Sequence, residues 1–301
     1  MNRFILPAIA IFVLVFSASC GPASSSAEAA SDSSATYIEN KGSDTIVNLA
    51  LAWAEAYQAE QPEIRISVTG GGSGTGIASL INGTVDLANA SRQIKEEEIA
   101  TAQSNGVEPV EHIIARDAIA VIVHPENPVS ELTLKQVSDI YSGKITNWSE
   151  VGGEDRPIVR LSRETNSGTH VYFLETVLRL GDSEDKTLFS MDTLLLPSSE
   201  GIIAEVRQNP NAIGYDGLGY VPKDLKMIGL AEQEGGAYVL PSIATVNDKT
   251  YPIARDLYMY TDGEPTGVIK EYLDWILDPE AQEIVAELGF VPALPTANSS
   301  P

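Results

Sequence analysis

Short apolar strands alternate with amphipathic helices along most of this 301-residue chain, and this alternation restricts the fold more than any other feature. Apolar residues recur at helical spacing from Ile46 to Tyr57, and residues 64–68 alternate as a half-buried strand does. Residues 118–123 form a continuous apolar run that Pro125 ends. The pattern predicts an α/β fold with a largely parallel sheet.

The same alternation continues toward the end of the chain. It predicts a strand at 158–161, a helix after Ser167, another near 202–207 and a well-formed one at 268–276. Pro279 suits the first turn of a further helix, because that position needs no amide donor. The length is enough for one large domain or two medium ones.

The first residues have the pattern of a secretory signal peptide. Arg3 precedes an apolar run of thirteen residues, 4–16, which small residues and then Cys20 follow. A membrane span needs about 20 apolar residues, so this run is too short to cross a bilayer comfortably. We therefore expect residues 1–19 to be a signal peptide and the protein to be exported.

Cys20 is the only cysteine, which excludes an intramolecular disulfide. A lone cysteine after small residues resembles the lipobox of bacterial lipoproteins, in which the cysteine is lipidated. That resemblance implies a lipid anchor at Cys20, a flexible tether over residues 20–35, and a location at the cell surface or in the periplasm. The alternative is ordinary signal cleavage beside an incidental cysteine.

The chain is strongly acidic, with 42 acidic and 19 basic residues and a formal net charge of −23. Binding to nucleic acid needs a basic face, and so does attachment to anionic lipid through bulk charge. Both classes of partner are therefore disfavoured. A single small anion is compatible with this charge, because a buried site depends on local donors and helix dipoles.

Three segments share one design, in which a strand leads through glycine and hydroxyl residues into a helix. They are residues 42–45 (GSDT), 70–76 (GGGSGTG) and 163–169 (RETNSGT). Free amide donors and the positive end of the helix dipole favour an anion at such a helix start. One loop alone is typical of an ordinary helix cap. Three together indicate an anion site.

Two arginines add planar guanidinium donors that suit a tetrahedral oxyanion. Arg163 begins the third loop, and Arg92 follows Ser91 after the apolar run at 85–88. For Arg92 the alternative is an ordinary salt bridge. On this chemistry we include Ser43 and Arg92 among the candidate ligands.

Enzymatic and cofactor motifs are missing from the sequence. The glycine loop lacks the third glycine of a dinucleotide fingerprint and the lysine of a nucleotide P-loop. The three histidines, His112, His124 and His170, lack the spacing of a zinc site, and a surface position on a helix is expected for His170. We therefore predict no cofactor, no metal site and no catalytic residues, and a surface phosphatase is disfavoured.

In order and spacing, these motifs resemble the extracytoplasmic phosphate-binding proteins of phosphate ABC transporters. The resemblance runs from about Lys41 to Pro292. Beyond the three loops it includes residues 140–148 (IYSGKITNW), 212–220 (AIGYDGLGY) and 289–292 (GFVP). It implies a monomeric, non-enzymatic solute-binding protein that captures inorganic phosphate and delivers it to ABC permease subunits.

The family fold is the two-lobed periplasmic-binding-protein fold of type II, with two crossover strands that form a hinge. Transferred to this chain, the first lobe holds residues 36–117 plus 245–301, and the second lobe holds residues 118–244. The strands would cross near Ala115–Asp117 and near Ala254–Asp256. The family's ligand-contacting positions fall on Thr45, Ser73, Ser91, Arg163, Ser167, Gly168 and Thr169.

One position departs from the family. Well-known members have an aspartate where this chain has Ser91, and that carboxylate accepts the proton that phosphate carries and sulfate lacks. The role would pass here to Asp44, our first choice, or to the Ser91 hydroxyl or Glu164. Sulfate, molybdate and tungstate therefore stay open as alternative ligands, and so does a sensor that presents bound phosphate to a signalling partner.

Overall fold

The computed structural model describes residues 35–293. The predicted signal peptide, the predicted lipidation site Cys20 and the predicted tether up to residue 34 lie outside the described residues. No helix within 35–293 is both long and apolar enough to cross a membrane.

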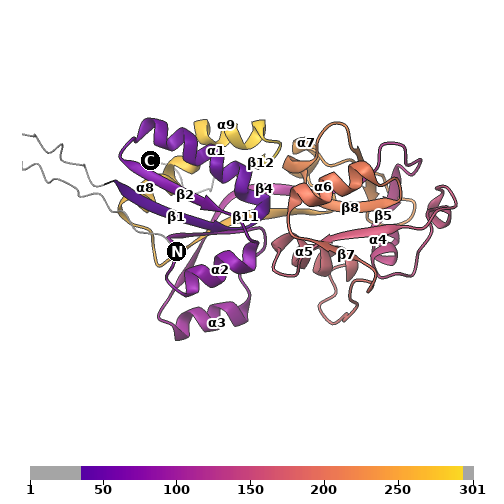
Figure 1. Cartoon of the computed structure of the whole chain (residues 1–301), viewed down its shortest axis with the longest axis horizontal. Helices are drawn as coiled ribbons and strands as arrows, with labels where there is room; N and C mark the ends of the chain where they lie inside the picture. Colours follow the sequence, from indigo (N-terminus) through magenta and orange to yellow (C-terminus); the bar gives the residue numbers. More distant parts are fainter. Residues whose placement is uncertain (1–34, 294–301) are drawn as a thin grey trace, which may run out of the picture. The chain divides into compact units, whose positions relative to one another are not determined.

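One continuous mixed sheet runs through the described residues, with helices against both of its faces (Figure 1). The strands follow the order β2-β1-β3-β11-β4-β8-β6-β7. They are β1 (Thr36–Gly42), β2 (Ile64–Thr69), β3 (Leu87–Ala90), β4 (Pro109–Val123), β6 (Val159–Arg163), β7 (Leu194–Leu196), β8 (Ala212–Gly217) and β11 (Ala254–Asp262). The α/β prediction is confirmed, but the sheet is mixed rather than largely parallel, because the long strands β4 and β11 pair antiparallel with each other and with β8 and β3.

Shorter strands complete the sheets. β9 (Lys226–Met227) and β12 (Val291–Pro292) both pair with β4. β5 (Glu131–Thr133) and β10 (Gly229–Ala231) form a separate parallel pair.

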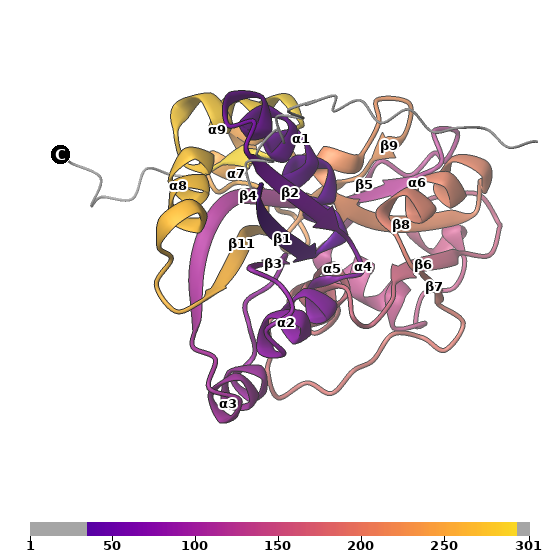
Figure 2. The same ribbon diagram turned by 60° about the vertical axis from the view of Figure 1, so that its left-hand side comes forward.

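The first lobe contains β1 to β3 and five helices that cover them. These are α1 (Asp44–Glu60), α2 (Ser73–Ile81), α3 (Glu96–Ser104), α8 (Gly267–Ile276) and α9 (Pro279–Glu287). Figure 2 shows α1, α8 and α9 on one side of these strands and α2 and α3 on the other. The predicted stripe from Ile46 to Tyr57 is the buried face of α1, and Trp53 at its centre is fully buried.

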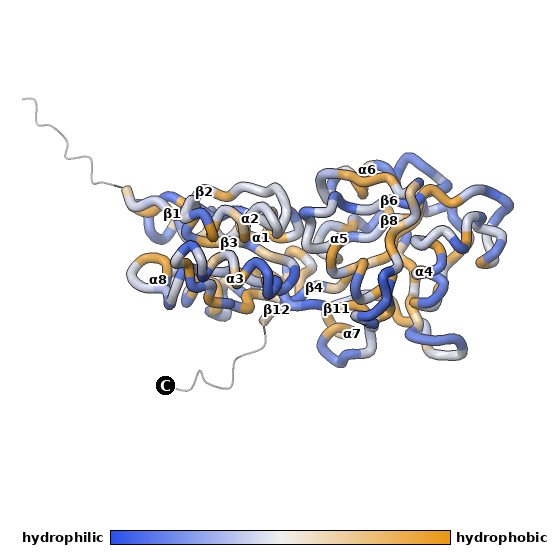
Figure 3. Tube along the Cα trace, turned by 90° about the horizontal axis from the view of Figure 1, so that it is seen from below, coloured by the Kyte–Doolittle hydropathy of each residue, from blue (hydrophilic) through white to orange (hydrophobic). Residues whose placement is uncertain are grey.

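The second lobe contains β6 to β8 and the remaining helices. These are α4 (Leu134–Tyr141), η1 (Trp148–Val151), α5 (Gly168–Phe173), η2 (Leu174–Leu178), α6 (Ser199–Gln208), η3 (Leu218–Tyr220) and α7 (Ile243–Asn247). Its core strands appear as hydrophobic stretches in Figure 3, most plainly along β8. The core is built around Ile119, Val121 and Tyr215, all fully buried.

The sequence assigned residues 245–253 to the first lobe, but in the structure they pack against the second lobe. Val246, Tyr251 and Ile253 belong to the buried cluster of the second lobe, and Tyr251 donates a hydrogen bond to the Ile119 carbonyl at 2.6 Å. The packing therefore places the chain's return to the first lobe at the start of β11.

Strands β4 and β11 are the two that extend from one lobe into the other, and they pair antiparallel with each other. Arg255 lies opposite Asp117, and Asp256 lies opposite Arg116. The two segments predicted to cross are thus neighbours in the sheet. This arrangement is the two-lobed fold with two crossover strands.

Candidate functional site

Each of the three glycine-hydroxyl loops leads into a helix, as the sequence predicts: α1, α2 and α5 follow them. Gly42 illustrates why glycine is needed there. Its φ is +147°, and a Cβ on it would clash with the backbone of Asn89, so only glycine lets β1 approach β3 this closely. The close approach brings the starts of α1 and α2 beside the end of β3.

Three serines of the first lobe form a buried hydroxyl cluster. The Ser43 hydroxyl donates to Ser91 Oγ at 2.9 Å, and Ser73 Oγ lies 3.2 Å from the same oxygen. The Ser91 amide also donates to Ser73 Oγ, at 3.0 Å. None of the three side chains is more than 1% exposed. The structure therefore brings together residues that lie up to 48 positions apart in the sequence.

The second lobe closes onto this cluster at the start of α5. Thr169 Oγ1 lies 2.9 Å from Thr45 Oγ1, and both threonines are buried. A Cβ on Gly168 would meet Ser91 Oγ at 2.5 Å and would come still closer to Ser73 Oγ. Ser167 is also buried, and its hydroxyl accepts from the His170 amide as the cap of α5. Seven predicted ligands thus gather from both lobes: Ser43, Thr45, Ser73, Ser91, Ser167, Gly168 and Thr169.

Arg163 pairs with Asp44, the residue between Ser43 and Thr45 in the sequence, and its side chain is almost fully buried. Its Nη2 donates to Asp44 Oδ2 at 2.6 Å and to the Pro197 carbonyl at 2.9 Å, while Nη1 donates to Ser199 Oγ at 2.9 Å. Its Nε has no hydrogen-bond partner among the described residues. The guanidinium is therefore held in place and retains a free buried donor.

Asp44 connects this arginine to the glycine loop. One carboxylate oxygen accepts from Arg163, and the other accepts from the Gly71 amide at 2.9 Å. The two contacts together hold the carboxylate in a fixed orientation. Asp44 is thus placed at the site, and its geometry fits an orienting role for Arg163 and the loop at least as well as the predicted role of proton acceptor.

Arg92 does not join the cluster. Its guanidinium forms a two-pronged ion pair with Glu98, at 2.8 and 2.7 Å, and also donates to the Gln93 carbonyl. Burial raises the pKa of Glu98, but the hydrogen bonds from Arg92 and the Lys95 amide outweigh it, so the pKa lies below its ordinary value. In this structure the alternative of a salt bridge describes the two Nη atoms of Arg92, which both donate to Glu98, while its Nε has no partner among the described residues.

Arg255 is the residue that the sequence reasoning missed. Its guanidinium reaches the hydroxyl cluster: Nη2 donates to Thr169 Oγ1 at 2.9 Å and to Thr45 Oγ1 at 3.4 Å, and Nη1 donates to the Ser91 carbonyl at 2.8 Å. Asp117 pairs with it at 3.1 Å. The available signal was an arginine in the predicted crossover segment, directly before an apolar strand.

His170 is buried rather than on a helix surface, so that expectation was wrong. Its Nδ1 lies 3.0 Å from Ser162 Oγ, and its ring packs on Phe189. Burial lowers the pKa of this imidazole. The side chain therefore joins α5 to β6 inside the second lobe. Residues 35–293 contain no group of three or more potential metal ligands.

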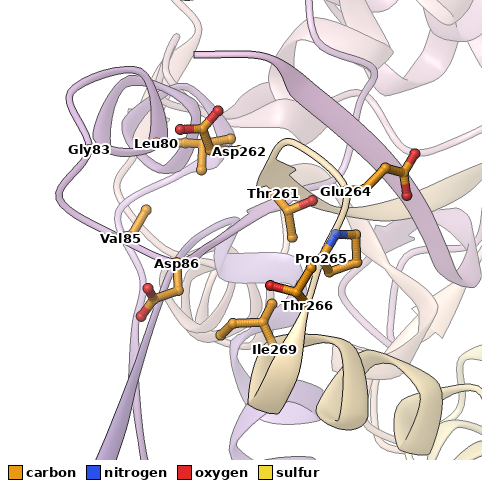
Figure 4. A pocket seen from close by; sticks show the side chains of 10 residues that line it. All are labelled: Leu80, Gly83, Val85, Asp86, Thr261, Asp262, Glu264, Pro265, Thr266 and Ile269. Carbon is orange, nitrogen blue, oxygen red and sulfur yellow. The ribbon is translucent and has the colours of Figure 1, made fainter. Parts of the chain in front are cut away.

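An open hollow of about 300 Å³ lies elsewhere, between the ends of α2 and α8 (Figure 4). Asp86, Asp262 and Glu264 line it, so its charge opposes an anion. Two of these carboxylates already accept hydrogen bonds from the backbone: Asp86 from the Glu39 amide, and Asp262 from the Glu108 amide. We assign it no role in binding.

Comparisons with known proteins show the family to which the chain belongs. The family described as PBP superfamily domain matches residues 27–280. A phosphate-binding protein PstS from Pseudomonas aeruginosa is 32% identical and covers 85% of this chain and 82% of its own length. The PstS of Bacillus subtilis is also 32% identical, with coverage of 97% and 94%. The chain belongs to the family of PstS phosphate-binding proteins.

A solved structure of the family supports the same relationship. A crystal structure from Clostridium perfringens, described as a phosphate ABC transporter substrate-binding protein with bound phosphate, matches with a TM-score of 0.77 and 33% identity. It covers 86% of this chain and all of that one. The two-lobed fold predicted from the sequence is therefore the fold of the family.

Proposed function

We propose that this member of the PstS family binds inorganic phosphate outside the cytoplasm and delivers it to the permease of an ABC transporter. The single observation that carries the proposal is the buried hydroxyl cluster, to which both lobes contribute and to which the Arg255 guanidinium donates. The hydroxyls of this cluster are buried and held in fixed positions. They suit one small oxyanion, because each charge-assisted hydrogen bond is strong in a low-dielectric site.

The ligands we propose are the hydroxyls and backbone of the three loops together with Arg163. From the first lobe they are Ser43, Thr45, Ser73 and Ser91, and from the second lobe Arg163, Ser167, Gly168 and Thr169. Arg92 was included on chemistry alone, and its ion pair with Glu98 argues for leaving it out.

Location and partners follow from the family and from the first residues of the sequence. We propose that the protein is exported through its signal peptide, is anchored by a lipid on Cys20, and works as a monomer that contacts permease subunits. We further propose that residues 36–117 and about 254–301 make the first lobe. The intervening residues would form the second lobe, because residues 245–253 pack there.

The proposal is tested by equilibrium binding of radiolabelled phosphate to the wild type and to Arg163→Ala and Ser167→Ala. A hydrogen bond to a charged group contributes about 1.5–3 kcal/mol, and each 1.4 kcal/mol is about tenfold in affinity. Loss of the Arg163 fork should therefore weaken binding about 100-fold or more, and loss of the Ser167 hydroxyl about tenfold or more.

Arg160→Ala is the matched control for the arginine variant. Arg160 is as deeply buried on the same strand, but it bonds to the Ile145 carbonyl and Asp192 and not to the cluster. Where it folds, it should bind phosphate as the wild type does. Unchanged phosphate affinity in both Arg163→Ala and Ser167→Ala would exclude this site.

A second candidate ligand is another tetrahedral oxyanion, such as sulfate. Ser91 motivates it, because a hydroxyl can donate to sulfate where an aspartate would repel it. Competition by sulfate, molybdate and tungstate against labelled phosphate separates the two cases. We expect phosphate to remain bound under excess sulfate.

A further inference from the structure

We propose that Arg255 is a second guanidinium ligand of the anion, at the floor of the cleft, and that it determines the affinity of the site together with Arg163. The inference rests on the proposed function and extends it to a residue outside the three loops. Arg255 comes from the crossover strand β11 and lies at the centre of the contacts between the lobes.

The placement of its guanidinium is the first argument. Nη2 reaches Thr45 of the first lobe and Thr169 of the second lobe, and Nη1 reaches the carbonyl of Ser91. Two of these contacts are to hydroxyls that we propose as ligands, those of Thr45 and Thr169. An anion that accepts from the Thr45 and Thr169 hydroxyls therefore lies within reach of the same Nη2.

The orientation of the guanidinium is fixed before any ligand arrives. The Tyr172 ring lies 5.5 Å from its central carbon, and Tyr172 donates a hydrogen bond to the Ala254 carbonyl at 2.7 Å. Stacking on an aromatic ring holds the planar group at little cost in solvation. The Nε of Arg255 is buried and has no partner among the described residues. The side chain thus keeps one buried N–H donor that no described residue uses.

Charge is the third argument. Three carboxylates, Asp44, Asp117 and Asp216, surround Arg163 and Arg255, so acidic groups outnumber basic ones by one. Burial raises the pKa of Asp117 to about 6, although Arg255 opposes this rise and Asp216 adds to it. Burial likewise raises the pKa of Asp216. With Arg163 alone, the site would present a strongly negative field to a dianion.

Two substitutions, one in each partner of the Arg255–Asp117 ion pair, test the proposal. If Arg255 is a ligand, they change the phosphate affinity differently. If Arg255 only supports the crossover strands, they change it by the same factor. Arg255→Gln removes the charge and should weaken phosphate binding about 30-fold, within the range for a lost charged hydrogen bond. Asp117→Asn removes only the competing carboxylate and keeps the Arg255 donors. Its affinity for phosphate should equal or exceed that of the wild type.

Calorimetry with inorganic phosphate measures both variants, and unfolding in urea without phosphate checks that each is folded. If Arg255 only braces the crossover strands, both variants weaken binding by similar factors or neither does, and the proposal is overturned. Should Arg255→Gln fail to fold because Asp117 is left unpaired, the double variant Arg255→Gln/Asp117→Asn replaces it with the same expected loss. Arg255→Lys should weaken phosphate binding about tenfold, between the wild type and Arg255→Gln, since lysine keeps the charge but lacks the planar set of guanidinium donors.

The result for the wild type separates this inference from the function on which it rests. No phosphate binding by the wild type rejects the proposed function. Phosphate binding by the wild type, lost in Arg163→Ala but retained in the folded variants that lack Arg255, rejects the role of Arg255 alone.

Discussion

The floor and the mouth of the cleft join the same two lobes by different chemistry. At the floor, the buried guanidinium of Arg255 donates to the Thr169 and Thr45 hydroxyls, at 2.9 and 3.4 Å. At the mouth, the exposed side chain of Asn166 donates to the Gly71 carbonyl at 2.8 Å, and the Gly74 amide donates to the Asn166 carbonyl at 3.0 Å. Buried charges are strong and costly to separate, whereas exposed neutral hydrogen bonds contribute little.

This difference suggests a division of tasks between the two regions. The floor should set how tightly the anion binds, because its donors are dehydrated and fixed. The mouth should set how fast the cleft opens, because its contacts form only when the lobes meet and water can replace them. Substitutions in each region test that division.

The largest effect is expected from Gly168→Ala, next to the floor. The new Cβ would meet the Ser73 and Ser91 hydroxyls, so the lobes could close only with a shift of α5. Overpacking typically costs about 1–3 kcal/mol, which corresponds to a loss of phosphate affinity of about 5- to 150-fold. Calorimetry measures it, and an affinity equal to that of the wild type would show that Gly168 does not approach the serines in the bound state.

Asp44→Asn should have an intermediate effect, because the residue connects the floor and the mouth. It holds Arg163 and the Gly71 amide, so loss of its charge should weaken anion binding about tenfold. An orienting role predicts equal losses for phosphate and sulfate in competition experiments. A change confined to phosphate would instead restore Asp44 as the acceptor of the phosphate proton.

The smallest effect is expected from Asn166→Ala at the mouth. Only the side-chain bond to Gly71 is lost, and the backbone contact to Gly74 remains. A neutral hydrogen bond contributes about 0.5–1.5 kcal/mol, so the dissociation rate of phosphate should rise about threefold. Stopped-flow measurements give this rate. A loss of affinity as large as that of Gly168→Ala would reject the division between floor and mouth.

Much of the fold could be predicted from the sequence, because its signals are local. The apolar stripe of α1 identified its buried face, and Pro279 marked the start of α9. The glycine-hydroxyl loops could be predicted equally well, since the local backbone conformation and the helix starts favour glycine and serine there. The predicted ligands of these loops do gather in one place.

The features that were missed depend on pairing across the fold. Arg255 acquires its surroundings because β11 pairs with β4, and nothing within its own segment reveals that partner. Arg92 stays a prediction from chemistry, and its two Nη groups form the salt bridge that the sequence left open as the alternative, with Glu98 six positions further along the chain. His170 occupies the first turn of a helix, and only the fold turns its ring toward the core.

The most direct measurement is a calorimetric titration of the purified protein with phosphate, repeated in a large excess of sulfate. The account predicts one phosphate bound per chain, with an affinity that excess sulfate changes little. The absence of phosphate binding, or its complete loss to sulfate, would contradict the assignment of the buried cluster as a phosphate site.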